Sequence, residues 1–342
     1  VLGDGEPLVT QDREHWEAAA LIAAGSLLFD DPVFVDFKPM IGDSTLWFFG
    51  HRGAEVRVSS SAPASFVYEG AGLIRFRDSD NYVFLDAAPF SDIEFPHHGH
   101  ADALSVELCV GQSEILIDPG GYGYYDDEFR RFFRSTAAHN TIEIDGRSQS
   151  DLYGVLGYGR LAKSRILGYM LNDDFDYVAA THDGYRPVQH RREVILLKRP
   201  EKVLVIVDYL ESPRPCNAVS RLHTSPGGHF DLDQQRVVIS GSNGSAAFAY
   251  SVAASGDVHS QVVKGRRDDS LQGWISPETG KVVAAEVLEL GVAVSSSATV
   301  VIAICLRPDE TVSAYLSERE RVELQLGSKR IVLSEVCNLA GS

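Results

Sequence analysis

The sequence predicts a mainly β fold, a large antiparallel β-sandwich with a short helical segment at its N-terminal end. From Thr45 onward, alternating or apolar runs are separated by Gly, Asn, Asp, Ser and Pro, which is typical of strands joined by turns. No G-x-G-x-x-G motif follows a strand-like run and precedes a helix, so nothing indicates a nucleotide-binding fold. The predicted strands are Leu46–Phe49, Glu55–Ser59, Gly72–Phe76, Tyr82–Asp86, Leu104–Val110, Ile115–Ile117, Glu193–Leu197, Val203–Asp208, Ala218–His223, Arg236–Ile239, Val282–Leu288, Thr299–Cys305, Val322–Leu326 and Arg330–Leu333.

The one convincing helix spans Asp12–Phe29. It is rich in good helix formers, Thr10 or Asp12 can cap its start, and Asp30–Pro32 ends it. We expect residues 1–40 to form a helical segment and residues 41–342 to form the β-sandwich domain. The alternative is a single helix docked on one β domain. The apolar stripe of the helix consists of Trp16, Ala19, Ala20, Ala23 and Leu27.

The charge of the chain limits its partners. Lys and Arg number 31 and Asp and Glu 48, so 31 − 48 gives a net charge of −17. This balance argues against a nucleic-acid binder or a binder of anionic membranes. It also opposes a polyanionic partner, unless a basic cleft lies on the acidic body. Four arginines of one central stretch suggest such a cleft: Arg130, Arg131, Arg134 and Arg147.

Cysteine usage and hydropathy add two further expectations. The four cysteines form no C-x-x-C pair, and Cys109 and Cys305 lie in apolar runs, so we expect buried free thiols. No apolar run reaches the roughly 18 residues of a membrane span. The chain starts at Val1 with neither a signal peptide nor an initiator Met, so we expect it to begin part-way through a longer protein.

The chemistry-bearing residues concentrate in residues 95–149. His98 and His100 share one face of an extended segment, because they are two residues apart. Asp118 ends an apolar run, and His139 opens another. Two imidazoles and a carboxylate at strand ends indicate a zinc site with nitrogen and oxygen ligands. The alternative is a hydrogen-bonded histidine pair that binds no metal.

This stretch resembles the C-terminal β domain of the heparinase II/III-like polysaccharide lyases, which include alginate and oligoalginate lyases. Several linked motifs in one order carry the resemblance, and it continues more faintly through residues 182–210. By the same resemblance, residues 1–40 look like the tail of an (α/α) toroid domain whose body is absent. The matching motifs are H-G-H-A-D-A-L-S (His98–Ser105), I-D-P-G (Ile117–Gly120), the tyrosines Tyr122, Tyr124 and Tyr125, F-R-S-T-A-A-H-N-T (Phe133–Thr141), Asp145–Gly146 and Gln149.

The resemblance implies β-elimination next to a uronic acid. That reaction needs a group that neutralises the carboxylate, a base for the C5 proton and an acid for the leaving oxygen. The resemblance places His98 at the carboxylate-neutralising position and Tyr125 at the catalytic tyrosine. Tyr122 and Tyr124 are close alternatives, and Tyr125 can equally be a packing residue of the turn.

The resemblance also implies a metal site and substrate contacts. Zinc would be held by His100, Asp118 and His139. Arg134 and Asn140 are the expected substrate-binding residues, since a guanidinium can bind a carboxylate in bidentate fashion. The alternative for Arg134 is an ion pair with an acidic residue of the preceding loop.

Three further residues have two interpretations each. Asp102 and Glu107 can orient metal ligands from a second shell or simply face water. His190 opens a strand that either lines the cleft or ends in solvent.

We therefore expect a polysaccharide lyase that contains zinc, acts on an anionic, uronic-acid polymer and works in the bacterial periplasm or outside the cell. No nucleic acid and no membrane span are expected, and a toroid domain or partner chain would complete the active site. The alternative is a non-catalytic carbohydrate-binding or scaffolding sandwich with a structural zinc. A cupin-type metal enzyme is disfavoured, because the Glu and the third His of that site cannot be placed.

Overall fold

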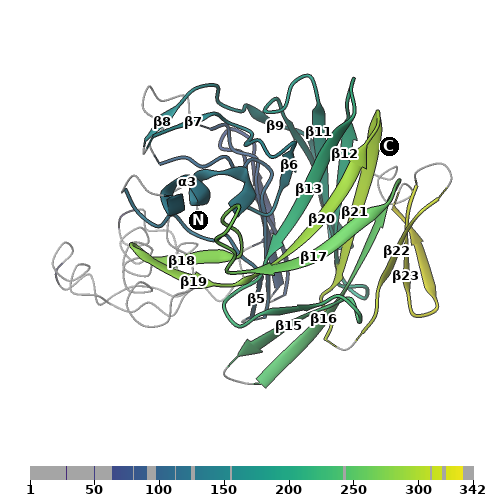
Figure 1. Cartoon of the computed structure of the whole chain (residues 1–342). Helices are drawn as coiled ribbons and strands as arrows, with labels where there is room; N and C mark the ends of the chain where they lie inside the picture. The colour runs from purple at the N-terminus through teal and green to yellow at the C-terminus, as the bar shows by residue number, and fades with distance from the viewer. Residues whose placement is uncertain are drawn as a thin grey trace. The chain divides into compact units, whose positions relative to one another are not determined.

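β-sheets dominate the fold in the computed structural model of the chain (Figure 1). The chain divides into two units, residues 7–64 and residues 1–6 with 65–342, and nearly all described residues belong to the second unit. The predicted helix Asp12–Phe29 apart from Leu28, the strands Leu46–Phe49 and Glu55–Ser59, and a domain boundary near residue 40 lie outside the described residues. The structure describes residues 28, 50, 64–79, 81–90, 98–111, 113–124, 128–154, 156–241, 244–308, 310–317 and 321–333.

The largest sheet has eight antiparallel strands, and its central strand β12 is apolar on both faces. Leu204 and Ile206 point to one side, Val205 and Val207 to the other, and all four are buried. A continuous apolar run is therefore what this position in the sheet requires. In spatial order the strands are β14 (His229–Asp231), β15 (Arg236–Gly241), β16 (Gly244–Ala254), β21 (Ser297–Cys305), β12 (Val203–Glu211), β11 (Gln189–Leu197), β10 (Phe175–His182) and β9 (Ser164–Leu171).

Smaller antiparallel sheets cover both faces of the eight-stranded sheet. The main core lies between one face and the sheets β1–β5 and β17-β20-β13-β6, and a second core lies under β22–β24. These strands are β1 (Phe66–Tyr68), β2 (Leu73–Asp78), β3 (Asn81–Asp86), β4 (Val106–Val110), β5 (Ser113–Leu116), β6 (Ile142–Ile144), β13 (Cys216–His223), β17 (Val258–Lys264), β20 (Glu286–Val294), β22 (Ser313–Leu316), β23 (Val322–Leu326) and β24 (Lys329–Val332).

Two hairpins and one short helical segment complete the described structure. The hairpins are β7 (Leu152–Tyr153) with β8 (Gly157–Tyr158), and β18 (Trp274–Glu278) with β19 (Lys281–Ala284). The helical segment is α3 (Glu128–Arg134) followed by the 3-10 turn η3 (Thr136–Ala138). Figure 1 shows α3 close to both hairpins.

The predicted fold class is confirmed, and the differences concern single elements. The strand pattern missed several strands, of which the longest are β9, β10, β16 and β17. Gly168 and Ala179–Ala180 dilute the β-branched content of β9 and β10, and small residues do the same in β16. The pattern also missed α3, whose helix packs through Phe129, Phe132 and Phe133 rather than through high helix propensity.

Two minor expectations also have outcomes. Cys109, Cys216 and Cys305 are buried free thiols, as predicted. Among the residues that the structure describes, none of the helices has the length and apolar character to cross a membrane.

Candidate functional site

The candidate site lies where the loop His98–Ser105, the end of β5 and the α3–η3 segment meet. Asp118 follows β5 at the predicted strand end, and His139 follows η3 directly. The backbone joins these parts: the Ala101 amide donates to the Arg134 carbonyl at 2.9 Å, and the Thr136 hydroxyl donates to the Ala101 carbonyl at 2.6 Å. Residues far apart in the sequence are thus held together.

A group with the ligands for a metal ion sits in this corner. One ligand atom each from His100, Asp102 and His139 lies within 4.8 Å of the others. Both imidazoles are buried, and their ring centroids are 5.3 Å apart. Two nitrogens and a carboxylate oxygen suit a metal such as zinc, so this buried group could hold a metal ion.

Asp118 joins the group through His139. Its Oδ2 lies 2.9 Å from His139 Nδ1, its Oδ1 accepts from the Gly120 amide at 2.9 Å, and His139 Nε2 donates to the Phe133 carbonyl at 3.0 Å. Burial alone would lower the pKa of His139, but the Asp118 carboxylate outweighs it and raises that pKa to about 9. The structure therefore places the predicted ligand Asp118 against His139, but the group whose ligand atoms converge on one another contains Asp102 in its place, so the predicted ligand set stays a prediction.

Asp102 belongs to this group, although the sequence indicates for it at most a role in orienting the metal ligands. Burial raises the pKa of Asp102 to about 7, with the nearby Asp86 adding to the effect. The signal was present in the sequence, because His98, His100 and Asp102 alternate in one motif. Which carboxylate would bind a metal could not be read from spacing alone.

An exposed histidine–tyrosine pair adjoins this group. The Tyr124 hydroxyl lies 2.9 Å from His98 Nδ1, and the two rings meet edge to face. The buried Arg130 places its guanidinium 5.1 Å from the Tyr124 ring centroid and donates to the Gly121 carbonyl at 3.3 Å. Tyr125, the predicted catalytic tyrosine, lies outside the described residues.

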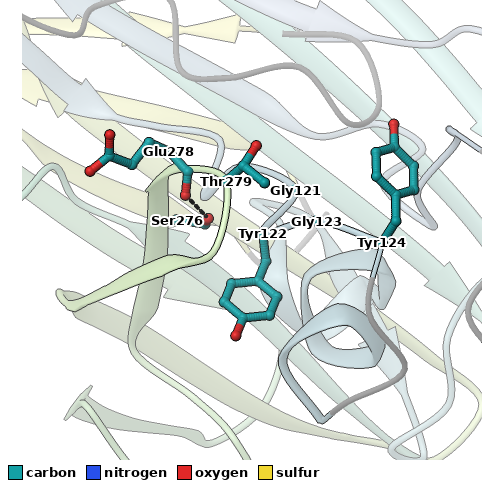
Figure 2. Close-up of a pocket in the computed structure, with 7 residues that line it drawn as sticks. All are labelled: Gly121, Tyr122, Gly123, Tyr124, Ser276, Glu278 and Thr279. Carbon is teal, nitrogen blue, oxygen red and sulfur yellow. Dashed lines mark hydrogen bonds between the residues drawn. The ribbon is translucent and has the colours of Figure 1, made fainter.

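A pocket opens beside Tyr124. Figure 2 shows Tyr122 and Tyr124 pointing in different directions from the glycine-rich turn, with the tip of the β18–β19 hairpin opposite them. Gly120 has a φ of +85°, and a Cβ there would lie 2.4 Å from the Ser276 carbonyl oxygen, so only glycine allows this approach. The lining residues are Gly121, Tyr122, Gly123, Tyr124, Ser276, Glu278 and Thr279.

The two predicted substrate-binding residues are both buried. Arg134 is 1% exposed, and its Nε donates to the Tyr158 hydroxyl of β8 at 2.8 Å. Asn140 donates to the Val106 and Ile117 carbonyls at 2.8 and 2.9 Å, and its Oδ1 accepts from the backbone amide and the ring of His223. Through these contacts both residues hold neighbouring segments of the site together. Their direct contact with a substrate stays a prediction.

The expected basic cleft has only partial support. Arg130 and Arg134 are buried, whereas Arg131 and Arg147 are exposed.

A second histidine cluster lies between the layers. His182 Nε2 is 3.0 Å from His190 Nδ1, His190 Nε2 is 2.7 Å from Asp208 Oδ1, and Arg192 binds both oxygens of Asp208. His190 is 1% exposed. Both interpretations of His190, a cleft wall and a solvated strand end, are therefore wrong. Burial is tolerated because the guanidinium neutralises Asp208 and the ring nitrogens are hydrogen-bonded.

Comparison with known families identifies the fold. The family model described as heparinase II/III-like, C-terminal, matches residues 60–304. The chain belongs to the heparinase II/III-like C-terminal family. The resemblance seen in the sequence motifs is therefore confirmed, and the family is one of polysaccharide lyases.

Solved structures agree on the fold. Heparan sulfate lyase HepC from Pedobacter heparinus matches with a TM-score of 0.70 and 15% identity, over 97% of this chain and 49% of that chain. A crystal structure of heparinase III matches with a TM-score of 0.72 and 16% identity, over 97% of this chain and 49% of that chain. The chain thus spans about half the length of these enzymes. Among curated proteins, none matches the sequence.

Proposed function

We propose that the chain is the β-sandwich part of a polysaccharide lyase that cleaves a uronic-acid polymer by β-elimination, with residues 1–40 as the end of a toroid domain. The observation that carries the proposal is the contact of 2.9 Å between His98 Nδ1 and the Tyr124 hydroxyl, beside the buried histidine–carboxylate group. Membership of a lyase family supports the reaction class.

His98 would neutralise the uronate carboxylate. If the Tyr124 hydroxyl donates to Nδ1, the proton of the neutral ring sits on Nε2, which can then donate to the substrate. This hydrogen bond strengthens as negative charge develops on the carboxylate when C5 loses its proton.

A tyrosine of the same turn would move the proton. The base takes the C5 proton, the C4–C5 double bond forms, and the C4–O bond breaks as the leaving oxygen is protonated. We assign this step to Tyr124: once its hydroxyl proton has passed to His98 Nδ1, the phenolate can take the C5 proton, and the His98 imidazolium can still donate from Nε2 to the uronate. The Arg130 guanidinium beside the Tyr124 ring would stabilise the phenolate charge. Tyr125 is the residue that the family resemblance favours, so the two tyrosines must be compared directly.

The metal would be zinc, held by His100, His139 and a carboxylate from Asp118 or Asp102. The donor set fits, since imidazole nitrogens and carboxylate oxygens are ordinary zinc ligands. Bound there, the ion would fix the loop that carries His98 and, with an open position, polarise a substrate oxygen. Asp118→Asn and Asp102→Asn, compared for metal content after purification without added metal, identify the carboxylate ligand.

The test is lyase activity of a longer protein that includes the toroid, followed as ultraviolet absorbance of the new double bond on a panel of uronate polymers. His98→Ala and Tyr124→Phe should each lower kcat by on the order of 100-fold or more. Tyr125→Phe is measured in parallel, and Tyr153→Phe, an exposed tyrosine of the β7–β8 hairpin, is the matched control. Activity on no polymer, or wild-type rates in the His98 variant, would reject the proposal.

The second candidate function is a non-catalytic carbohydrate-binding sandwich with a structural metal. The complete burial of His139 favours it, because an enclosed ion stabilises the fold whether or not catalysis occurs. Removal of the metal by a chelator should then lower Tm markedly, since a ligand that binds only the folded state stabilises it. Uronate oligosaccharides would bind without being cleaved.

A further inference from the structure

Arg192 occupies a central place between the layers. It lies on β11 opposite Asp208 of β12, and its side chain is fully buried. Nε donates to Asp208 Oδ1 at 2.7 Å, and Nη2 donates to Asp208 Oδ2 at 2.9 Å. This bidentate pair fixes the plane of the guanidinium on the paired strands β11 and β12.

The third nitrogen of the guanidinium reaches the candidate site. Nη1 donates to the carbonyl of Leu104 at 2.7 Å and to the carbonyl of Asn140 at 2.6 Å. Leu104 ends the loop that carries His100 and Asp102, and Asn140 directly follows His139. One side chain thus links the two segments that supply the metal-binding group.

We propose that Arg192 is a positioning residue that holds these two segments together and thereby sets the geometry of the metal-binding group. Leu104 has a φ of +64°, a backbone conformation that a leucine keeps only when its surroundings hold it in place. The hydrogen bond from Arg192 Nη1 to the Leu104 carbonyl, and that from the Leu104 amide to the Asp86 carbonyl at 2.6 Å, provide this restraint.

The histidine cluster supports this linkage of the two segments by Arg192, which we call the Arg192 clamp, because it also binds Asp208. His190 donates to the same Asp208 oxygen that Arg192 Nε binds, and His182 donates to His190. The Gly184 amide donates to His182 Nδ1 at 3.1 Å, so the proton of the His182 ring lies on Nε2, and the hydrogen bonds run from His182 through His190 to Asp208. Asp208 is therefore held on both sides, and its position determines that of the guanidinium.

The first test needs no metal. In metal-free Arg192→Lys, amide hydrogen exchange in residues 98–105 and 139–141 should accelerate about tenfold or more relative to the rest of the main core, because an ammonium group cannot bind the carboxylate and both carbonyls in one plane. Arg221→Lys is the matched control. Arg221 is also a buried arginine whose side chain bridges two carboxylates, those of Glu143 and Glu289. Within the described residues, its link to the two segments is made by its backbone amide, which donates to the Thr141 carbonyl at 3.3 Å and is retained in the lysine variant.

The second test rests on the proposed metal site. Cobalt(II) affinity, measured by competition with a chelator, should fall about 10–100-fold in Arg192→Lys and by less in Asp208→Asn, and the visible spectrum of the bound cobalt should change. Arg221→Lys should lower Tm with little change in cobalt affinity. If the role of Arg192 is purely structural, Arg192→Lys should behave like Arg221→Lys: Tm falls, and the cobalt affinity and visible spectrum of the folded protein stay unchanged.

The outcomes separate the two proposals. If the wild-type protein binds no cobalt, the metal site fails, and the exchange measurement alone decides the clamp. Exchange in Arg192→Lys that rises uniformly, or not at all, would overturn the clamp whatever the metal does. If Arg192→Lys does not fold, Asp208→Asn decides by the same two measurements.

Discussion

The candidate site and the cluster behind it are built from the same residue types, yet their histidines differ. In the first, His139 faces the Asp118 carboxylate, and its pKa is raised to about 9. In the second, His190 faces the Asp208 carboxylate, and its pKa is lowered. Both pairs are buried, so burial alone cannot explain the opposite directions.

The guanidinium of Arg192 contributes to the difference. Burial lowers the pKa of His190 most, the Asp208 carboxylate opposes this in part, and the charge of Arg192 lowers it further. The ion pair of Asp118 within the described residues is with His139 itself. A carboxylate that already has a cation stabilises a second one much less. The cluster with arginine is therefore neutral framework, whereas in the candidate site a metal ion would have to displace the proton that the Asp118 carboxylate keeps on His139.

Exposure separates the two regions as well. The candidate site adjoins the exposed His98 and Tyr124, and Tyr124 lines a pocket. His182 and His190 have their ring nitrogens engaged inside the protein. A substrate can reach the first region, whereas the second can act only through the positions of its neighbours.

The largest expected effect is on metal binding. His139→Ala should abolish binding of zinc, found near one equivalent in the parent protein, because it removes a ligand from a site whose structural counterparts are worth about 10–16 kcal/mol. Elemental analysis of protein purified without added metal measures it. His190→Gln is the counterpart in the second cluster and should keep the metal content of the parent. Equal loss of metal in both variants would contradict the assignment of metal binding to the candidate site alone.

The next largest effect is on stability. Arg192→Met should lower the free energy of unfolding by about 3–5 kcal/mol, because it leaves the Asp208 charge buried without its cation. In the same variant the pKa of His190 should rise, as His139's does beside Asp118. Chemical denaturation and histidine NMR titration measure the two quantities. Arg192→Met with Asp208→Asn should recover part of the stability, and a His190 pKa that stays low in the single variant would contradict the role of the guanidinium.

Much of the site could be predicted from its residues, and the failures have physical causes. The strand-end position of Asp118 follows from an apolar run that stops before Pro119–Gly120, and the fold class follows from alternation and turns. The burial of Arg134 and Asn140 could not be predicted, because their partners Tyr158 and His223 lie far along the chain.

The second cluster escaped prediction for a related reason. His182, His190 and Asp208 lie on three strands that become neighbours only when the eight-stranded sheet forms. Charged residues at the end of an apolar run usually indicate solvent. Here these residues form a buried cluster in which Arg192 neutralises Asp208. The cluster becomes evident only from the register in which β10, β11 and β12 pair.

The smallest expected effect concerns acid stability, and it tests whether the second cluster is held neutral. Burial lowers the pKa values of both His182 and His190, and the neighbouring Arg192 adds to this. Above about pH 6.5, the ordinary pKa of histidine, both are neutral in the folded and the unfolded chain, and their contribution to stability is complete. Below that pH the unfolded chain takes up protons that the folded one does not, so stability falls by up to about 1.4 kcal/mol per pH unit for each histidine.

His182→Gln should therefore flatten the loss of stability between about pH 6.5 and 5, because glutamine can replace both hydrogen bonds and does not titrate in this range. His259→Gln, at an exposed position of β17, should leave the slope of the parent protein unchanged. Urea unfolding at a series of pH values measures the slopes. If His182→Gln is as acid-sensitive as the parent, the ring of His182 is charged in the folded protein. The contrast between the two clusters would then come from their accessibility alone.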